Sequence, residues 1–353
     1  MKLYIHKDIF YPDAWWVKFK WLFDKKYKDI NYEIVNLHYE NNINDLQIGN
    51  DDYCICRFGH YEEDFELSKR VYPLLYEKFN GRIWPNKEDW YYYNNKKRQL
   101  EFFEKNNVPH PISHYSYGRE DFTEWVNENN LEYPIVVKKS QGAGSEEVDL
   151  VYEKEYSWYD EVNRKKKFFD ETDWDVIDFP SIIQQYIDVD YDIRIAFINN
   201  KVLFLKRFHQ WKTKNKDNFP YGTDKKPIEK KLKYKLAPYE EPRCESLDEK
   251  EILKLLPIVN YLHDKFNTIS IGWDIIGDIE NFKVLEFSYI FQNELRDCKS
   301  YYDMKTNEIK NLVYDKRLQF TFIQNEILKS IKETSYGSKK EKSYYGKNRI
   351  RFS

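Results

Sequence analysis

The spacing of hydrophobic and polar residues changes several times along this chain of 353 residues. Before about residue 93, short apolar runs alternate with segments of helical periodicity. The apolar runs are residues 2–6, 32–37, 52–58 and 81–85, and the helical segments are residues 14–27 and 62–79. This alternation of strands and helices predicts a small α/β domain with a parallel sheet.

Residues 133–151 contain two strand-like runs on either side of a glycine loop. The loop residues are Gly142, Ala143, Gly144 and Ser145. Glu147 stands where a GxGxxG motif needs its last glycine, and no helix pattern follows, which argues against a dinucleotide-binding motif and a phosphate loop. The pattern favours a β-hairpin flap over residues 140–145, whose backbone N–H groups can cover a polyphosphate beside Lys138. A simple tight turn between strands is the alternative.

A β-hairpin is predicted where two β-rich runs are separated by two asparagines at residues 199–200. A two-residue loop pairs Asp192 with Arg207 and Arg194 with Leu205. Because side chains alternate between the two faces of a strand, the three charged residues share one face. The cluster is either a catalytic floor or a cross-strand salt bridge at the margin of a sheet.

A second hairpin is predicted from residues 269–276 and 282–288. The expected cross-strand pairs are Ile276 with Phe282, Asp274 with Val284, and Gly272 with Glu286. Asp274, Glu286 and Ser288 then share a face, with the two carboxylates as diagonal neighbours roughly 7–8 Å apart. Carboxylates on adjacent strands suit Mg²⁺, which protein sites usually hold through one or two carboxylates and substrate phosphates.

Taken in chain order, these motifs resemble those of the ATP-grasp family over about residues 94–303. The matching pieces also include Asn95-Lys96 before a helix and a QQYI segment at residues 184–187. The resemblance implies an ATP-grasp fold of two α+β lobes that clasp ATP. It also implies that a small Rossmann-like pre-ATP-grasp α/β domain precedes these lobes.

The resemblance further implies a role for each candidate residue. Lys96 and Lys138 hold the nucleotide phosphates beneath the flap, and Arg207 with Arg194 meets the transferred phosphoryl group. The hinge that contacts adenine consists of Gln184, Gln185, Tyr186 and Ile187. The acidic residue after the hinge, which binds ribose, is Asp190. The implied Mg²⁺ ligands are Asp274, Glu286 and Ser288.

Within this family, two segments are similar to ATP-grasp proteins of bacterial polysaccharide and capsule biosynthesis. They are the flap at residues 139–148 and the ExSYxF pattern at residues 286–291. Three positions depart from the usual ATP-grasp pattern. Ser288 replaces an Asn, Gln185 replaces a Glu, and Asn95 replaces an Asp.

The resemblance and the periodicity together divide the chain into four parts. The expected parts are a pre-ATP-grasp domain at 1–93, a small lobe with flap and charged insertion at 94–180, a C-terminal lobe with the metal site at 181–332, and a polar basic tail at 333–353.

Composition limits the classes of partner. The net charge of −3 and the pI of about 6.2 disfavour a nucleic-acid binder that neutralises phosphates. No apolar run approaches the roughly 18 residues of a membrane span, and the N-terminus lacks the apolar run of a signal peptide. The expected location is therefore the cytoplasm, and a homodimer is compatible with the sequence.

The expected function is ATP-dependent ligation of a carboxylate to an amine through an acyl phosphate, with release of ADP and phosphate. The substrates are expected to be small molecules, and sugar-linked ones such as a uronic acid are candidates in surface-polysaccharide modification. Two alternatives stay open: a phosphotransferase on the same fold, and a non-catalytic ATP-binding module.

Overall fold

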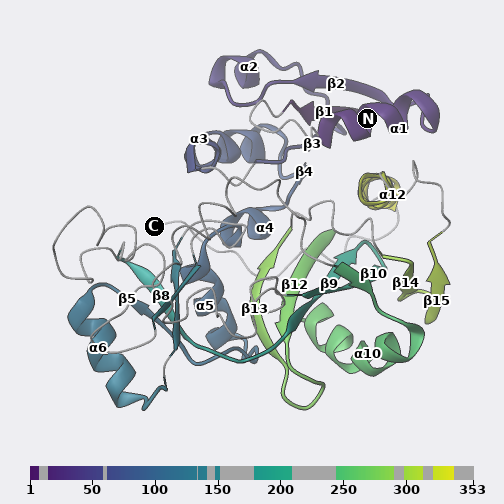
Figure 1. Cartoon of the computed structure of the whole chain (residues 1–353). Coiled ribbons are helices and arrows are strands. Elements are labelled where there is room, and N and C mark those ends of the chain that lie inside the picture. The colour runs from purple at the N-terminus through teal and green to yellow at the C-terminus, as the bar shows by residue number, and fades with distance from the viewer. Residues whose placement is uncertain are drawn as a thin grey trace, which may run out of the picture. The chain divides into compact units, whose positions relative to one another are not determined.

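The structure is a computed structural model that forms two compact units, each considered by itself (Figure 1). The described residues are 1–7, 15–58, 62–132, 134–140, 148–151, 179–208, 244–289, 298–312 and 321–337. The first unit contains Met1–Arg57, Arg70–Trp84 and Val313–Ser353, and the second contains Phe58–Lys69 and Pro85–Leu312.

The first unit is built on a four-stranded parallel sheet of order β2-β1-β3-β4. Its strands are β1 (Lys2–His6), β2 (Asn31–Val35), β3 (Tyr53–Ile55) and β4 (Ile83–Trp84), and its helices include α1 (Trp15–Lys25), α2 (Glu40–Asp45) and part of α3 (Glu62–Lys78). Trp15 of α1 stacks on Trp84 with ring centroids 5.3 Å apart. The predicted small α/β domain with a parallel sheet is confirmed.

The C-terminal helix α12 (Phe322–Gly337) belongs to this first unit. Tyr27, just after α1, donates a hydrogen bond from Oη to Oδ1 of Asn325, over 2.8 Å. The sequence pattern grouped the corresponding residues with the C-terminal lobe and its tail. Contact between the two ends of a chain leaves no local periodicity, so the pattern had no means of showing it.

The second unit begins with a four-stranded antiparallel sheet of order β5-β8-β6-β7. Its strands are β5 (Ser113–Ser116), β6 (Ile135–Lys139), β7 (Val148–Val151) and β8 (Ser181–Gln185), and its helices are α4 (Lys87–Tyr92), α5 (Lys96–Lys105) and α6 (Arg119–Glu128). Phe122 and Val126 of α6 pack against Ile135, Val137 and Ile183 of the sheet. β6 and β7 are antiparallel, so the strand–loop–strand pattern is confirmed.

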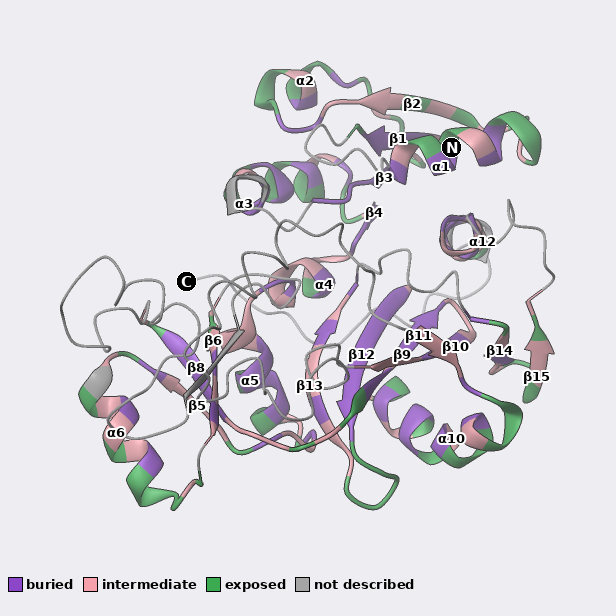
Figure 2. Cartoon of the chain, viewed as in Figure 1, coloured by how far each residue is buried: buried purple, intermediate pink, exposed green. Residues whose placement is uncertain are grey.

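A larger antiparallel sheet forms the rest of the second unit, in the order β13-β12-β9-β10-β14-β15, with β11 also paired to β10. Its strands are β9 (Tyr191–Ile198), β10 (Lys201–Phe208), β11 (Cys244–Ser246), β12 (Ser270–Ile276), β13 (Lys283–Ser288), β14 (Ser300–Asp303) and β15 (Glu308–Asn311). Helix α10 (Glu249–His263) lies along one side of this sheet (Figure 1). Its residues Ile252, Val259 and Leu262 join the core. Figure 2 shows β12 as buried along its length.

The registers of the two central hairpins test the sequence patterns directly. In β9–β10, Asp192 pairs with Arg207 and Arg194 with Leu205, so the predicted register is confirmed. In β12–β13 the predicted register is wrong. Ile276 pairs with Lys283 instead of Phe282, and the ladder shifts by one more residue between Ile275 and Asp274. A β-bulge adds one residue to one strand of a pair, and alternation of apolar and polar residues carries no signal for it.

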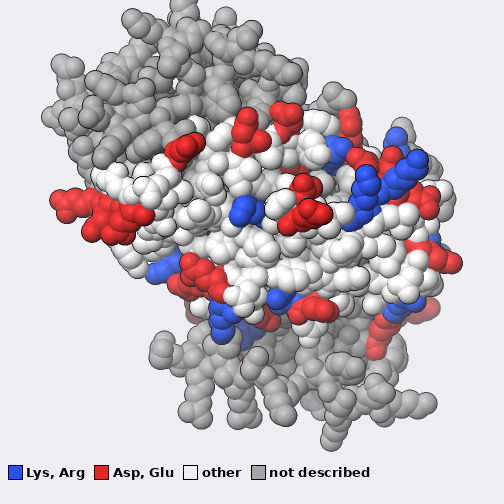
Figure 3. All heavy atoms as spheres, turned by 90° about the horizontal axis from the view of Figure 1, so that it is seen from below, with Lys and Arg blue, Asp and Glu red and all other residues white. Residues whose placement is uncertain are grey.

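Charged side chains of both signs are interspersed on the face of the molecule in Figure 3. Among the described residues, no helix has both the length and the apolar character that crossing a membrane requires.

Gly277 makes the turn of the β12–β13 hairpin possible, because its φ of +89° is one that residues with a Cβ rarely adopt. An added Cβ would also lie 2.6 Å from the carbonyl oxygen of Asn281. We expect Gly277→Ala to lower the free energy of unfolding by about 1–3 kcal/mol, measured by urea denaturation.

The matched control is Gly118→Ala, because an added Cβ there meets no heavy atom within 4 Å and the backbone is extended. Gly118 is the N-cap of α6, so this change should cost less than about 1 kcal/mol. Equal losses in the two variants would contradict the role of the Gly277 turn.

Candidate nucleotide and metal site

Two arginines and two aspartates form an ion-pair cluster on one face of β9, β10 and β12. Arg194 binds Asp274 with two hydrogen bonds, from Nε to Oδ1 and from Nη2 to Oδ2, each 2.7 Å long. Nη2 of Arg207 lies 2.9 Å from Oδ2 of Asp274. The Nε and Nη2 atoms of Arg207 each lie 2.6 Å from Oδ1 of Asp192. The sequence placed Asp192, Arg194 and Arg207 on one face, and the pairing of β12 with β9 adds Asp274, which lies opposite Arg194.

Burial and the neighbouring arginines together determine whether each aspartate of the cluster is ionised. Asp274 is only 2 % exposed. Loss of water alone would raise its pKa, but the guanidinium groups of Arg194 and Arg207 outweigh this and hold the pKa well below its usual value. Burial raises the pKa of Asp192 to about 6, although Arg207 opposes the rise. Asp274 is therefore the firmly ionised member of the cluster.

Glu286 lies directly opposite Asp274, and Ser288 lies opposite Gly272. The predicted shared face of Asp274, Glu286 and Ser288 is confirmed, although the two carboxylates face each other directly instead of diagonally. Because β13 is next to β12, Glu286 extends the row of charged groups that begins on β9 and β10.

Lys138 of β6 brings a cation from the small sheet to these carboxylates. Desolvation lowers the pKa of its ammonium to about 8, and the charge of Lys96 adds to this effect. The charges of Glu286 and Asp274 oppose it. The interactions place both predicted phosphate-binding lysines and both predicted metal carboxylates in one electrostatic neighbourhood.

Asn95 positions Lys96 at the start of α5. Its side chain accepts a hydrogen bond of 3.0 Å from the backbone N–H of Arg98 and thereby caps the helix. The backbone N–H of Lys96 donates to the carbonyl of Ser140, over 2.9 Å, at the end of β6. An Asn serves this capping role as well as the Asp that the family pattern led us to expect.

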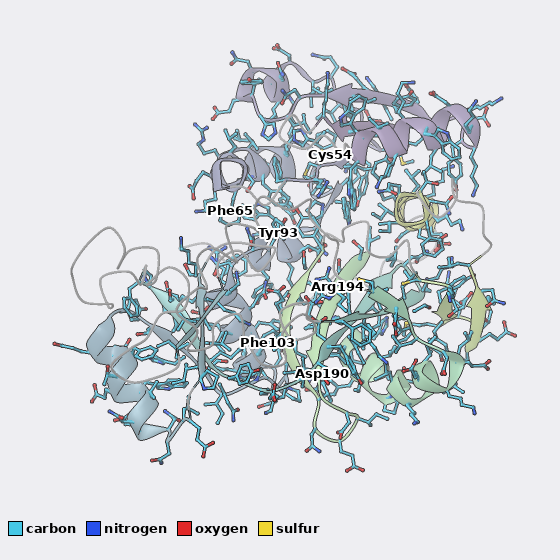
Figure 4. All side chains as sticks on the ribbon, viewed as in Figure 1. Cys54, Phe65, Tyr93, Phe103, Asp190 and Arg194 are labelled. Atoms are coloured by element: carbon cyan, nitrogen blue, oxygen red, sulfur yellow. The ribbon has the colours of Figure 1, made fainter. Side chains whose placement is uncertain are left out.

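The predicted hinge is part of β8 and the segment after it. Gln184 is buried, and its Nε2 donates to Oγ of Ser113 over 3.0 Å. The backbone N–H of Gln185 donates to the carbonyl of Ile112, over 2.8 Å. Oη of Tyr186 donates to Asp188, over 3.0 Å, in the segment that leads to the exposed Asp190 labelled in Figure 4.

The oxygen donors of Asp274, Glu286 and Ser288 fit a magnesium ion. Oδ2 of Asp274 already accepts from both arginines, whereas Oδ1 accepts only from Arg194 among the described residues and keeps a second lone pair. Glu286 has a half-buried carboxylate beside it. No cluster of three or more His, Cys, Asp or Glu ligands occurs in the described part of the chain. Two carboxylates and a hydroxyl suit Mg²⁺, which otherwise binds water and phosphate oxygens.

Several predicted features lie outside the described residues. They are the flap residues Gly142, Ala143, Gly144 and Ser145, the charged insertion at 152–178, and the tail from 338 onward.

Comparison with known families now decides the fold. A family described as "RimK-like ATP-grasp domain" matches residues 93–219. The chain has the ATP-grasp fold. A comparison with curated proteins gave no match.

Solved structures agree on this ATP-grasp fold at low sequence identity. D-alanine–D-alanine ligase from Bacillus anthracis has a TM-score of 0.56 at 12 % identity, over 96 % of this chain and 99 % of that one. A RimK domain ATP-grasp protein from Sphaerobacter thermophilus has a TM-score of 0.51 at 10 % identity, over 93 % of this chain and 100 % of that one. The ATP-grasp ligase PsnB, complexed with minimal precursor, Mg and ADP, has a TM-score of 0.52 at 11 % identity, over 94 % and 98 %.

Asp274 and Glu286 should contribute differently to the free energy of unfolding. Asp274→Asn leaves two largely buried arginines without their shared carboxylate and should lower the free energy of unfolding by about 3–5 kcal/mol at pH 7. Because the folded pKa of Asp274 is below its ordinary 3.8, its contribution is present above that pH and is lost as the pH falls. The difference between wild type and variant, measured by urea denaturation, should therefore shrink in acid.

Glu286→Gln is the matched control for Asp274→Asn. Glu286 is half-buried and faces Asp274, and its charge supports that of Lys138 only in part, so its neutralisation should change the free energy of unfolding by less than about 1 kcal/mol. A larger loss in Glu286→Gln than in Asp274→Asn would contradict this assignment of the ion pairs.

Proposed function

We propose that this protein is an ATP-dependent ligase that joins a carboxylate to an amine through an acyl phosphate, with release of ADP and phosphate. One observation carries the proposal. Arg194, Arg207, Asp274 and Glu286 share one sheet face, and Lys138 lies close enough for the carboxylates to act on its pKa. Cations on one side and carboxylates on the other suit a polyphosphate with its divalent cation.

The nucleotide would bind between the two sheets of the second unit. Lys138 and Lys96 would hold its phosphates, and the flap at residues 142–145 would cover them. Because the N–H of Gln185 already donates to Ile112, the adenine contact falls on the hinge after it, at Tyr186 and Ile187. Asp190 would then bind the ribose hydroxyls.

Glu286 and the remaining lone pair on Asp274 would hold Mg²⁺, with Ser288 as a third oxygen donor. When bound, the ion neutralises charge on the phosphates and on the transferred phosphoryl group. The protein's own task at this position is to keep the buried Asp274 ionised, and Arg194 and Arg207 do so by holding its pKa well below its usual value.

The reaction follows from the groups that this face provides. A carboxylate oxygen of the substrate attacks the γ-phosphorus of ATP, the bond to the β–γ bridging oxygen breaks, and ADP leaves. The amine then attacks the acyl carbon, phosphate leaves with the bonding electrons, and the amine gives up a proton. Arg207, with Arg194, stabilises the negative charge that moves during the first step.

Asp192 contributes to this step by holding Arg207 in place. Its Oδ1 accepts from two nitrogens of the same guanidinium, which fixes the plane of the group. An arginine fixed in this way needs little reorganisation when the phosphoryl group is transferred, which is the property that makes electrostatic stabilisation effective.

The substrate class follows from the resemblance of the flap and of residues 286–291 to polysaccharide-biosynthesis proteins. We propose a sugar-linked carboxylate, such as a uronic acid, and a small amine, in the cytoplasm. The ATP-grasp fold and the ligase descriptions of two similar structures support ligation.

The products distinguish the proposed reaction from its alternatives. With a carboxylate and an amine that the enzyme accepts, found by screening acid and amine pools for ATP-dependent phosphate release, chromatography should show ADP and phosphate in equal amounts with an amide. AMP and pyrophosphate would exclude the acyl-phosphate route. A stable phosphorylated product in the presence of amine would indicate a phosphotransferase instead.

Arg207→Ala should separate catalysis from nucleotide binding. Turnover should fall by about 10²–10³-fold, because one charge-stabilising contact in the transition state is lost, while ATP binding measured by calorimetry stays detectable. Lys206→Ala is the control, because this neighbouring cation pairs with Glu251 on the other face of β10 and should keep wild-type turnover. Equal turnover in the two variants would remove Arg207 from the mechanism.

A further inference from the structure

Strand β13 is the outermost strand of the large sheet, so one of its edges has no strand beside it among the described residues. The side chain of Gln99, on α5, takes the place of a neighbouring strand at this edge. Its Nε2 donates to the carbonyl of Phe287 over 3.0 Å, and its Oε1 accepts from the N–H of Phe287 over 3.2 Å. One amide therefore satisfies both backbone groups of a single residue.

The Gln99 amide makes three hydrogen bonds within the protein. Besides its two bonds to Phe287, it donates from Nε2 to the carbonyl of Tyr92 over 3.1 Å, and the residue is only 4 % exposed. A buried amide with both hydrogens and its oxygen engaged fixes its surroundings closely, since each lost bond would leave a buried polar group without a partner.

The residue that Gln99 fixes lies between two of the proposed metal ligands. Phe287 points its side chain into the core, and Glu286 and Ser288 on either side of it point to the opposite face. Fixing the backbone of Phe287 therefore fixes the positions from which Glu286 and Ser288 reach the site.

Gln99 also belongs to the helix that presents a phosphate lysine. Lys96 stands three residues earlier, at the first position of α5. Phe102 and Phe103 of the same helix pack against the ring of Phe287, with centroids 5.4 and 5.8 Å apart, and Figure 4 labels Phe103. The aromatic contacts hold α5 against β13, and the hydrogen bonds of Gln99 set the position along the strand.

Another segment, the one that contains Pro109, hydrogen-bonds to this edge of β13 nearer the start of the strand. The N–H of Val284 donates to the carbonyl of Pro109, over 2.7 Å. The register shift lies between the pairs that Val284 and Glu286 form with β12, so this bond fixes the strand on one side of the irregularity. Gln99 fixes it on the other side, where the proposed metal ligands are.

We propose that Gln99 is a positioning residue that sets Glu286 and Ser288 at the correct distance from Lys96, and so couples metal binding to phosphate binding. The inference rests on the proposed function, since it takes Glu286 and Ser288 as metal ligands. Gln99 touches neither nucleotide nor metal in this scheme. It acts through the backbone of β13.

Two substitutions test the proposal. Gln99→Met keeps the length and volume of the side chain but cannot donate to either carbonyl. Gln99→Glu keeps the acceptor for the Phe287 N–H but turns an oxygen toward the carbonyls of Phe287 and Tyr92. The control is Leu255→Ala, which removes buried volume from α10 in the same core but has no polar group that could hydrogen-bond the backbone of β13.

Two readouts separate positioning from general stability. Amide hydrogen exchange reports the Phe287 N–H directly, and calorimetric titration of ADP at increasing Mg²⁺ gives the Mg²⁺ concentration at half-saturation. Both Gln99 variants should exchange the Phe287 amide faster and raise the half-saturating Mg²⁺ concentration about tenfold, as lost supporting contacts typically do at metal sites. Leu255→Ala should lower the melting temperature and leave the Mg²⁺ requirement within twofold of wild type.

The inference is overturned if the Gln99 variants lose melting temperature but keep the wild-type Mg²⁺ requirement, because Gln99 is then structural only. Gln99→Met alone decides the matter if Gln99→Glu does not fold. A wild-type protein that binds ADP without any dependence on Mg²⁺, or does not bind it, would instead contradict the proposed function itself.

Discussion

The Asp274 carboxylate is the point on which the candidate site depends, because it is buried in the large sheet and ionised only through two arginines. Arg194 binds it from the adjacent strand β9 and Arg207 from β10, the next strand, and Asp192 holds Arg207 in turn. Burying one such charge without partners would cost several kcal/mol, so the four residues are stable only as a set. The alternatives of a catalytic floor and a salt bridge at a sheet margin are therefore not exclusive. The salt bridge is what keeps a catalytic arrangement charged inside a protein.

Around this set, the second unit brings together groups from separate sheets. The small sheet contributes Lys138, whose pKa falls to about 8 because it loses water while the charges of Glu286 and Asp274 support it only in part. A phosphate arriving beside this ammonium would restore its full charge, since an anion raises the pKa of a nearby lysine. The protein thus prepares a site that is more favourable with an anion present than without one.

The sequence allowed much of this to be predicted, and the failures have physical causes. The two-asparagine turn fixed the register of β9–β10, so the pairing of Asp192 with Arg207 was predictable. The register of β12–β13 was not, because alternation carries no signal for the one-residue offset at the turn or for the extra residue at the bulge. Together they shift the pairing by two residues, which leaves Asp274, Glu286 and Ser288 on one face. Gln99 was missed because a single polar residue on the apolar side of a helix looks like an exception in the pattern. A polar residue among Leu100, Phe102 and Phe103 was the only available signal. The association of α12 with α1 depends on contact between chain ends and has no local signature.

The central claim is that the face bearing Asp274 and Glu286 is where nucleotide phosphates and a metal meet. A crystal structure of the protein with Mg²⁺ and a non-hydrolysable ATP analogue tests it most directly. The account predicts the metal on Glu286, the phosphates within hydrogen-bonding distance of Lys138, and the γ-phosphate facing Arg207. A nucleotide bound elsewhere, or bound here with Glu286 away from the metal, would contradict it.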